Sequence, residues 1–70
     1  MQKISVSISG HQTSITLEPE FIEILKKIAT IQHTSVSAII YKIDNSRSQN
    51  TNLSSAVRIW ILNQMILPDK

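Results

Sequence analysis

The sequence predicts an α+β fold that is mostly helical, with an N-terminal β segment and three helices in one small domain. Apolar and polar residues alternate strictly near the start of the chain, which is the pattern of half-buried strands. From residue 19 onward, apolar residues recur at helical spacing instead. A chain of 70 residues buries only roughly 60% of its unfolded surface. We therefore expect a second copy of the chain to complete the core.

The β segment, expected over residues 4–17, changes phase at its middle. Apolar residues occupy even positions over 4–9 and odd positions over 13–17, on either side of Gly10 and His11. A hairpin that turns at Gly10 and His11 places every apolar side chain on one face, and glycine at the first central position suits a type II′ turn. The expected cross-strand pairs are Ile8 with Thr13, Val6 with Ile15 and Ile4 with Leu17. The other face carries Ser5, Ser7, Ser9, Gln12, Ser14 and Thr16.

Two other structures also account for the phase change. One long strand with a β-bulge at Gly10 restores the phase, but it leaves Ile4, Val6 and Ile8 without cover. A frayed N-terminus is disfavoured because these three side chains are apolar and β-branched. The hairpin is favoured, since it packs them against the apolar face that the following strand already forms.

The first two helices are expected over 19–32 and 35–47. Pro19 suits the first turn of a helix, and the apolar residues that follow form one stripe. Ser35 is the expected N-cap of the second helix, because its hydroxyl can accept a hydrogen bond from a free N–H group of the first turn.

A third helix is expected over 53–66, after a polar loop and before Pro68. Its apolar residues spread around the whole cylinder, and a helix of that kind is buried on nearly all sides. A monomer this small is unable to surround it, so an obligate homodimer is expected. The residues expected in the shared core are Ile15, Leu17, Phe21, Leu25, Ile39, Ile43 and Trp60.

The composition excludes several classes of protein. Cysteine is absent, so disulfides and thiolate metal sites are excluded and a cytoplasmic protein is expected. His11 and His33 lack the closely spaced companions of a metal site, and we expect no metal and no cofactor. Neither a signal peptide nor a membrane-spanning stretch is expected. The net charge of +2 permits nucleic-acid binding but does not argue strongly for it.

The order of these elements resembles the ribbon-helix-helix family, the fold of the Arc and methionine repressors. The resemblance is carried by Thr13-Ser14-Ile15-Thr16-Leu17-Glu18-Pro19-Glu20, by Leu25-Lys26-Lys27-Ile28-Ala29 and by Ser35-Val36-Ser37-Ala38-Ile39-Ile40. Residues 9–14, 43–47 and 52–58 resemble, more narrowly, a subgroup of short bacterial members. The similarity covers roughly residues 4–65.

The resemblance implies an intertwined homodimer in which strands from two chains pair antiparallel, with an additional C-terminal helix in each chain. It also implies that the β-ribbon enters the major groove of double-stranded DNA. The implied base-reading residues are Gln12, Ser14 and Thr16, and the glutamine amide can bond adenine N6 and N7 together. The implied phosphate anchor is the start of the second helix, at Thr34, Ser35 and Val36.

Two features depart from the family pattern. The ribbon offers only serine, threonine and glutamine, whereas many members place arginine or lysine there. If each chain supplies a hairpin, the dimer sheet has four strands spaced about 4.8 Å apart, and it is broader than a major groove of about 12 Å.

The expected function is therefore that of a homodimeric, sequence-specific DNA-binding transcription regulator, such as a repressor. The alternative is a protein-interaction or dimerisation module, antitoxin-like or adaptor-like, which binds a protein partner and no DNA; an apolar patch on the dimer favours it. An enzyme is not expected, because the serines lack a nucleophile elbow and a histidine–carboxylate arrangement. Asp44, Arg47 and Arg58 are compatible with an anion or substrate site, but a structural ion-pair network at the dimer base is favoured.

Overall fold

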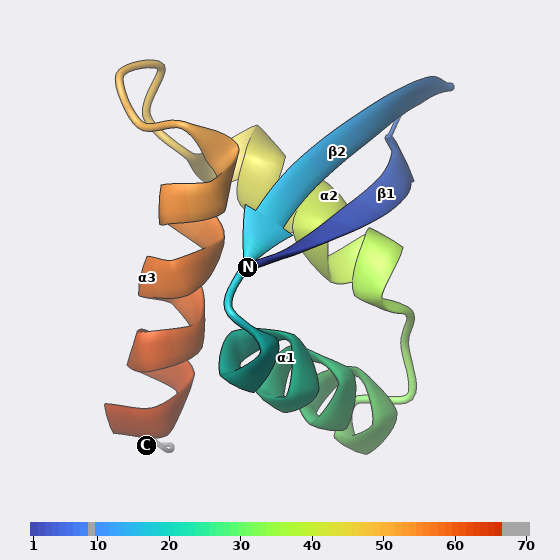
Figure 1. The fold of residues 1–70 in the computed structure, drawn as a ribbon, viewed down its shortest axis with the longest axis vertical. Coiled ribbons are helices and arrows are strands. Elements are labelled where there is room, and N and C mark those ends of the chain that lie inside the picture. Colours follow the sequence, from blue (N-terminus) through green and yellow to red (C-terminus); the bar gives the residue numbers. More distant parts are fainter. Residues whose placement is uncertain (9, 67–70) are drawn as a thin grey trace.

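An antiparallel hairpin and three helices make up the structure, a computed structural model that describes residues 1–8 and 10–66 (Figure 1). The elements are β1 (Gln2–Ile8), β2 (His11–Leu17), α1 (Pro19–Ile31), α2 (Val36–Ser46) and α3 (Leu53–Ile66). The predicted fold class, with an N-terminal β segment and an additional C-terminal helix, is confirmed. Ser9, expected on the polar face, and Pro68, expected beyond the last helix, lie outside the described residues.

The hairpin is formed within one chain, as predicted, but the predicted position of its turn is wrong. The last cross-strand pair joins Ile8 with His11, so His11 belongs to β2 and, contrary to the prediction, is not a loop residue. Gly10 therefore takes the second central position, with a φ of +81°. Only glycine reaches that left-handed conformation without strain, and its place in the turn therefore fixes where the chain reverses.

The register differs from the prediction by two residues. Ile15 lies opposite Ile4 and not opposite Val6, while Val6 lies opposite Thr13. Because successive side chains alternate between the two faces of a strand, a shift of two leaves each residue on its predicted face. The buried residues of the hairpin are Val6, Ile8, Ile15 and Leu17.

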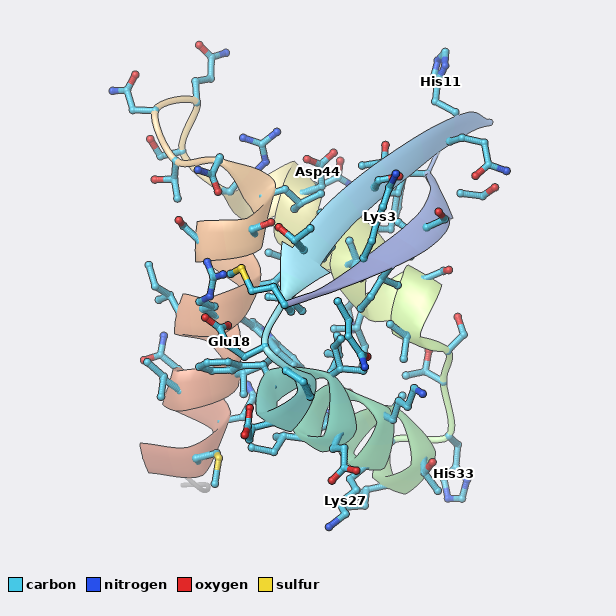
Figure 2. All side chains as sticks on the ribbon, viewed as in Figure 1. Lys3, His11, Glu18, Lys27, His33 and Asp44 are labelled. Carbon is cyan, nitrogen blue, oxygen red and sulfur yellow. The ribbon has the colours of Figure 1, made fainter. Side chains whose placement is uncertain are left out.

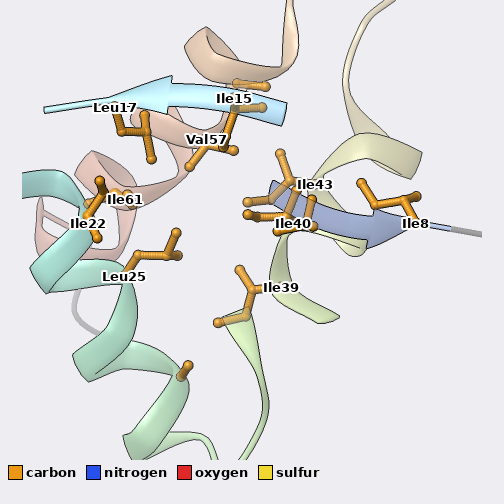
Figure 3. Packing of buried hydrophobic residues seen from close by; sticks show 13 residues of the cluster. Ile8, Ile15, Leu17, Ile22, Leu25, Ile39, Ile40, Ile43, Val57 and Ile61 are labelled. Atoms are coloured by element: carbon orange, nitrogen blue, oxygen red, sulfur yellow. The ribbon is translucent and has the colours of Figure 1, made fainter. Parts of the chain in front are cut away.

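The core lies between the apolar face of the hairpin and the three helices (Figure 3). β1 packs against α2 and β2 against α3, and α1 contacts both other helices. The largest fully buried side chains come from four of the five elements and are Leu17, Leu25, Ile39, Ile40, Val57 and Ile61. Leu17 is the last residue of β2 and Leu25 lies in the middle of α1, and both are fully buried in this core.

The end of α1 is a Schellman motif with a histidine in the position that glycine usually takes. His33 has a φ of 56°. Its N–H donates to the carbonyl oxygen of Thr30 at 3.1 Å, and the N–H of Thr34 donates to that of Ala29 at 2.9 Å. These two hydrogen bonds define the motif and satisfy carbonyl groups at the helix end. The sharp reversal brings the chain directly to Ser35.

The starts of α2 and α3 are capped by side chains. The Oγ of Ser35 accepts a hydrogen bond from the N–H of Ala38 at 3.0 Å, so Ser35 is the N-cap of α2 as predicted. The Oδ1 of Asn52 accepts one from the N–H of Ser55 at 2.9 Å and caps α3 in the same way. Local side-chain chemistry thus places the first residue of both helices.

Five of the seven residues predicted to share a core are buried within one chain, namely Ile15, Leu17, Leu25, Ile39 and Ile43. Phe21 and Trp60 are only half-buried and pack against that cluster. Other apolar side chains are largely uncovered, with exposed fractions of 75% for Ile31, 54% for Ile59 and 58% for Met65. One chain therefore leaves part of α1 and α3 open, and the sharing of a core between two chains stays a prediction.

Candidate nucleic-acid interface

The outer face of the hairpin is polar along its whole length. Gln12, Ser14 and Thr16, the predicted base-reading residues, are all exposed on this face of β2. They lie opposite Ser7, Ser5 and Lys3 of β1, which are exposed as well. We call these six residues the polar sheet face. A row of hydroxyl and amide groups on an exposed strand pair can donate and accept hydrogen bonds, which is what reading base edges requires.

Lys3 adds a positive charge to the polar sheet face that the sequence-based prediction missed. It pairs with Thr16 across the hairpin, and its side chain rises from the outer side of the sheet (Figure 2). The alternation that identified Ser5 and Ser7 extends to position 3, so the same period-two pattern could have found it. The departure from the family pattern therefore holds for β2 alone, because the neighbouring strand carries a lysine.

The predicted phosphate anchor lies at the start of α2. Thr34 and Ser35 are exposed and Val36 is half-buried. The Ser35 hydroxyl accepts the hydrogen bond from Ala38, while the first N–H groups of any helix have no acceptor within the helix. The helix dipole adds partial positive charge at the same end, so this position suits an anion.

This anchor borders β1 and not β2. Val36 lines a hollow of about 320 Å³ together with residues 2–5 of β1 and part of α1. The predicted base-reading residues and the predicted phosphate anchor are thus separated by the width of the hairpin. A surface that uses both must extend across the two strands.

Both arginines are engaged in ion pairs. The Nε of Arg47 donates to Oδ1 of Asp44 at 2.8 Å, and the Nε of Arg58 donates to Oε1 of Glu18 at 3.0 Å. Within one chain Arg58 thus contacts a residue 40 positions earlier in the sequence and neither Asp44 nor Arg47, and a network of these residues at the dimer base stays a prediction. The hydrogen bond from Arg58 is the main reason that the pKa of Glu18 lies below its ordinary value.

The sequence profile of the ribbon-helix-helix domain matches residues 1–65. The chain belongs to the ribbon-helix-helix family. Domains of this family are found in DNA-binding transcription regulators and in antitoxins. Comparisons with curated proteins and with solved structures gave no significant match.

The described part of this ribbon-helix-helix chain holds neither a metal-ligand cluster nor a membrane-spanning helix. Within residues 1–8 and 10–66, no three histidine, cysteine or carboxylate side chains come together as metal ligands would. His11 lies beside the hairpin turn and His33 at the end of α1, far apart in the fold (Figure 2). No helix in the described part of the chain has the length and apolar character needed to cross a membrane.

Proposed function

We propose that this ribbon-helix-helix chain is a homodimeric, sequence-specific DNA-binding transcription regulator that reads the major groove with its hairpin strands. The observation that carries the proposal is the polar sheet face, on which Gln12, Ser14 and Thr16 are exposed side by side along β2. A sheet that only covers a core would also need polar residues on its outer face. It would not need a polar strand followed by a capped helix, which is the order of elements in the ribbon-helix-helix family.

Dimerisation through β2 is favoured by the surroundings of its outer edge. Residues 13–16 line a hollow of about 370 Å³ between β2 and the start of α3. In the described residues, β2 pairs with no strand other than β1, so the backbone groups on its other edge have no strand partner within one chain. Antiparallel pairing of the two β2 strands makes Gln12, Ser14 and Thr16 of both copies one continuous ribbon.

Base reading and phosphate contact have different chemical consequences. The Gln12 amide can form two hydrogen bonds with adenine, so Gln12→Ala is expected to relax preference at one base position per half-site by about 1–3 kcal/mol. Contacts at the start of α2 carry no base information and are expected to strengthen binding to all sequences alike. Equal loss on every sequence for Gln12→Ala would show that its reading role is wrong.

The experiment is a gel shift with the purified chain and the DNA upstream of its own gene, at two salt concentrations. Specific binding that weakens steeply with salt is expected, because phosphate contacts release counterions. Sedimentation of the same sample should give a dimer, and a stable folded monomer at micromolar concentration would contradict the dimer. An absence of any DNA binding at low salt would refute the proposed function.

A pair of substitutions at Ser35 separates anion binding from helix capping. Asparagine and aspartate both cap helices well, so Ser35→Asn and Ser35→Asp should preserve the hydrogen bond to Ala38 and the stability of α2. Only the aspartate adds negative charge where a phosphate is expected. Ser35→Asp should therefore abolish DNA binding while Ser35→Asn retains it, and equal binding by both variants would exclude this anchor.

A second function is favoured by one specific observation, the exposed apolar residues of α1 and α3. Ile31, Ile59 and Met65 remain more than half exposed in a single chain. If they stay exposed in the dimer, a patch of this kind fits a protein partner, as in an antitoxin or adaptor. Protection of these residues from solvent exchange in the free dimer would assign them to dimerisation and exclude this alternative.

A further inference from the structure

A hollow at the outer edge of β1 brings two lysines together from different elements. Lys3 of β1 and Lys26 of α1 both line the hollow of about 320 Å³ that also borders Val36, the first residue of α2. Both lysines are exposed, whereas Leu25 beside them is fully buried. The hollow therefore has an apolar base with positive charge at its opening, next to the positive end of the α2 dipole.

Neither lysine takes part in an ion pair with any described residue. The ion pairs in that part of the chain join Asp44 with Arg47 and Glu18 with Arg58, and they use both arginines. Both side chains are exposed and have no partner among the described residues, so both ammonium groups are available to an external anion. Because both arginines are engaged in ion pairs, the cations beside this hollow that are available for an external anion are the two lysines.

The width of the dimer sheet indicates which anion this is, on the basis of the proposed function. With two β2 strands at the centre, each β1 becomes an outer strand, and three spacings of about 4.8 Å separate the two outer strands by about 14 Å. A major groove of about 12 Å admits the two central strands but not the outer pair. Each β1 strand then lies over a groove wall, where the phosphates of the DNA backbone are located.

We propose that Lys3 and Lys26 bind the DNA backbone phosphates beside the start of α2, so that β1 supplies the positive charge that β2 lacks. Each chain of the dimer contributes one such pair. A hairpin in place of a single strand is then compatible with groove binding, because its outer strand contacts phosphates and leaves base reading to Gln12, Ser14 and Thr16.

Salt dependence measures this role directly. Each phosphate contact contributes about 0.9 to the slope of log K against log salt. Removing one lysine from both copies of a dimer should therefore reduce the slope by about 1.8, on every DNA sequence alike. Fluorescence anisotropy with a single labelled duplex of fixed sequence, titrated from about 50 to about 200 mM salt, gives the slope for each variant.

The variants are Lys3→Gln, Lys26→Gln and Lys3→Arg, with Lys27→Gln as the matched control. Lys27 follows Lys26 in the same helix but lines a different hollow and points away from the hairpin (Figure 2). Its loss changes the net charge equally. We expect both glutamine variants at positions 3 and 26 to lower the slope by about 1.8, with Lys27→Gln unchanged and Lys3→Arg equal to wild type. Thermal unfolding of each variant checks that the fold is retained.

The outcomes separate this inference from the proposed function. If wild type binds the duplex and the position 3 and 26 variants behave like Lys27→Gln, the lysine pair has no phosphate role although DNA binding stands. If wild type shows no binding at low salt, the proposed function fails and this inference is overturned with it. A loss of slope in the Lys3→Arg variant as large as in Lys3→Gln would also overturn it, because the arginine keeps the charge.

Discussion

Replacing His33 with glycine should stabilise the protein, although it removes a whole side chain. His33 ends α1 with a φ of 56°. In this conformation a residue other than glycine has a backbone strain of about 1–2 kcal/mol. Glycine at the same position increases the conformational freedom of the unfolded chain, which lowers the free energy of unfolding by about 0.5–1 kcal/mol. The His33 side chain is exposed, so little packing is lost. The net gain is about 0.5–1 kcal/mol.

Gln32→Gly is the matched control for this substitution. Gln32 is exposed like its neighbour, but its φ of −87° is ordinary, so glycine relieves no strain there. A loss of about 0.5–1 kcal/mol is expected from chain entropy alone. The two glycine variants should therefore differ by about 1–2 kcal/mol, from the sum of the two expected effects.

Thermal unfolding followed by circular dichroism checks this difference. For a domain of this size, about 1 kcal/mol corresponds to a change of about 4–8 °C in Tm. All variants must be compared at one protein concentration, because the stability of a dimer depends on it. A His33→Gly variant that is destabilised as much as Gln32→Gly would refute the reasoning, since it would mean that the left-handed conformation at His33 carries no strain.

Three other predictions test the packing, an ion pair and the turn. Trp60→Ala should lower the free energy of unfolding by about 3–5 kcal/mol if a second copy covers this half-buried ring, and chemical denaturation showing a loss below about 1 kcal/mol would contradict a shared core. Since the pKa of Glu18 is lowered in the folded chain, its ion pair contributes stability above the ordinary pKa of 4.5, which is lost as pH falls through the folded value. Melting curves between neutral and acidic pH should show a smaller decrease for Glu18→Gln than for wild type. Gly10→Ala should destabilise the hairpin by about 1 kcal/mol, through backbone strain alone, because a Cβ at Gly10 meets no atom within 4 Å; unchanged stability would exclude that strain.

The faces of the hairpin could be predicted from the sequence, but its register could not. Ile4, Val6 and Ile8 alternate with serines, and so do the residues of the second strand, so any shift by two positions satisfies the same pattern. Only the place of Gly10 within the turn separates the two registers. The type II′ rule put glycine first, whereas the structure has it second.

Local rules predicted the N-cap at Ser35, and they failed where a contact joins distant parts of the chain. The cap depends on residues three positions apart, which the sequence displays directly. The ion pair of Glu18 with Arg58 depends on how α3 packs beside β2, and no periodicity reports that. His33 was not expected to end α1 in a left-handed conformation, because glycine or asparagine is the usual signal. The role of the polar sheet face stays a prediction.

In the proposed complex, the position of one glycine also sets a distance along the DNA. In this structure glycine takes the second central position of the turn. If the glycine moved from position 10 to position 11, the same preference would favour a turn at 10 and 11. β1 would then slide by two residues against β2. At about 3.4 Å per residue the slide is about 6.8 Å, on the order of two nucleotides along one DNA strand. Every side chain would keep its face, while Lys3 would move from beside Thr16 toward Glu18. A change in the turn would thus alter the spacing between the bases that β2 is proposed to read and the phosphates that β1 is proposed to bind.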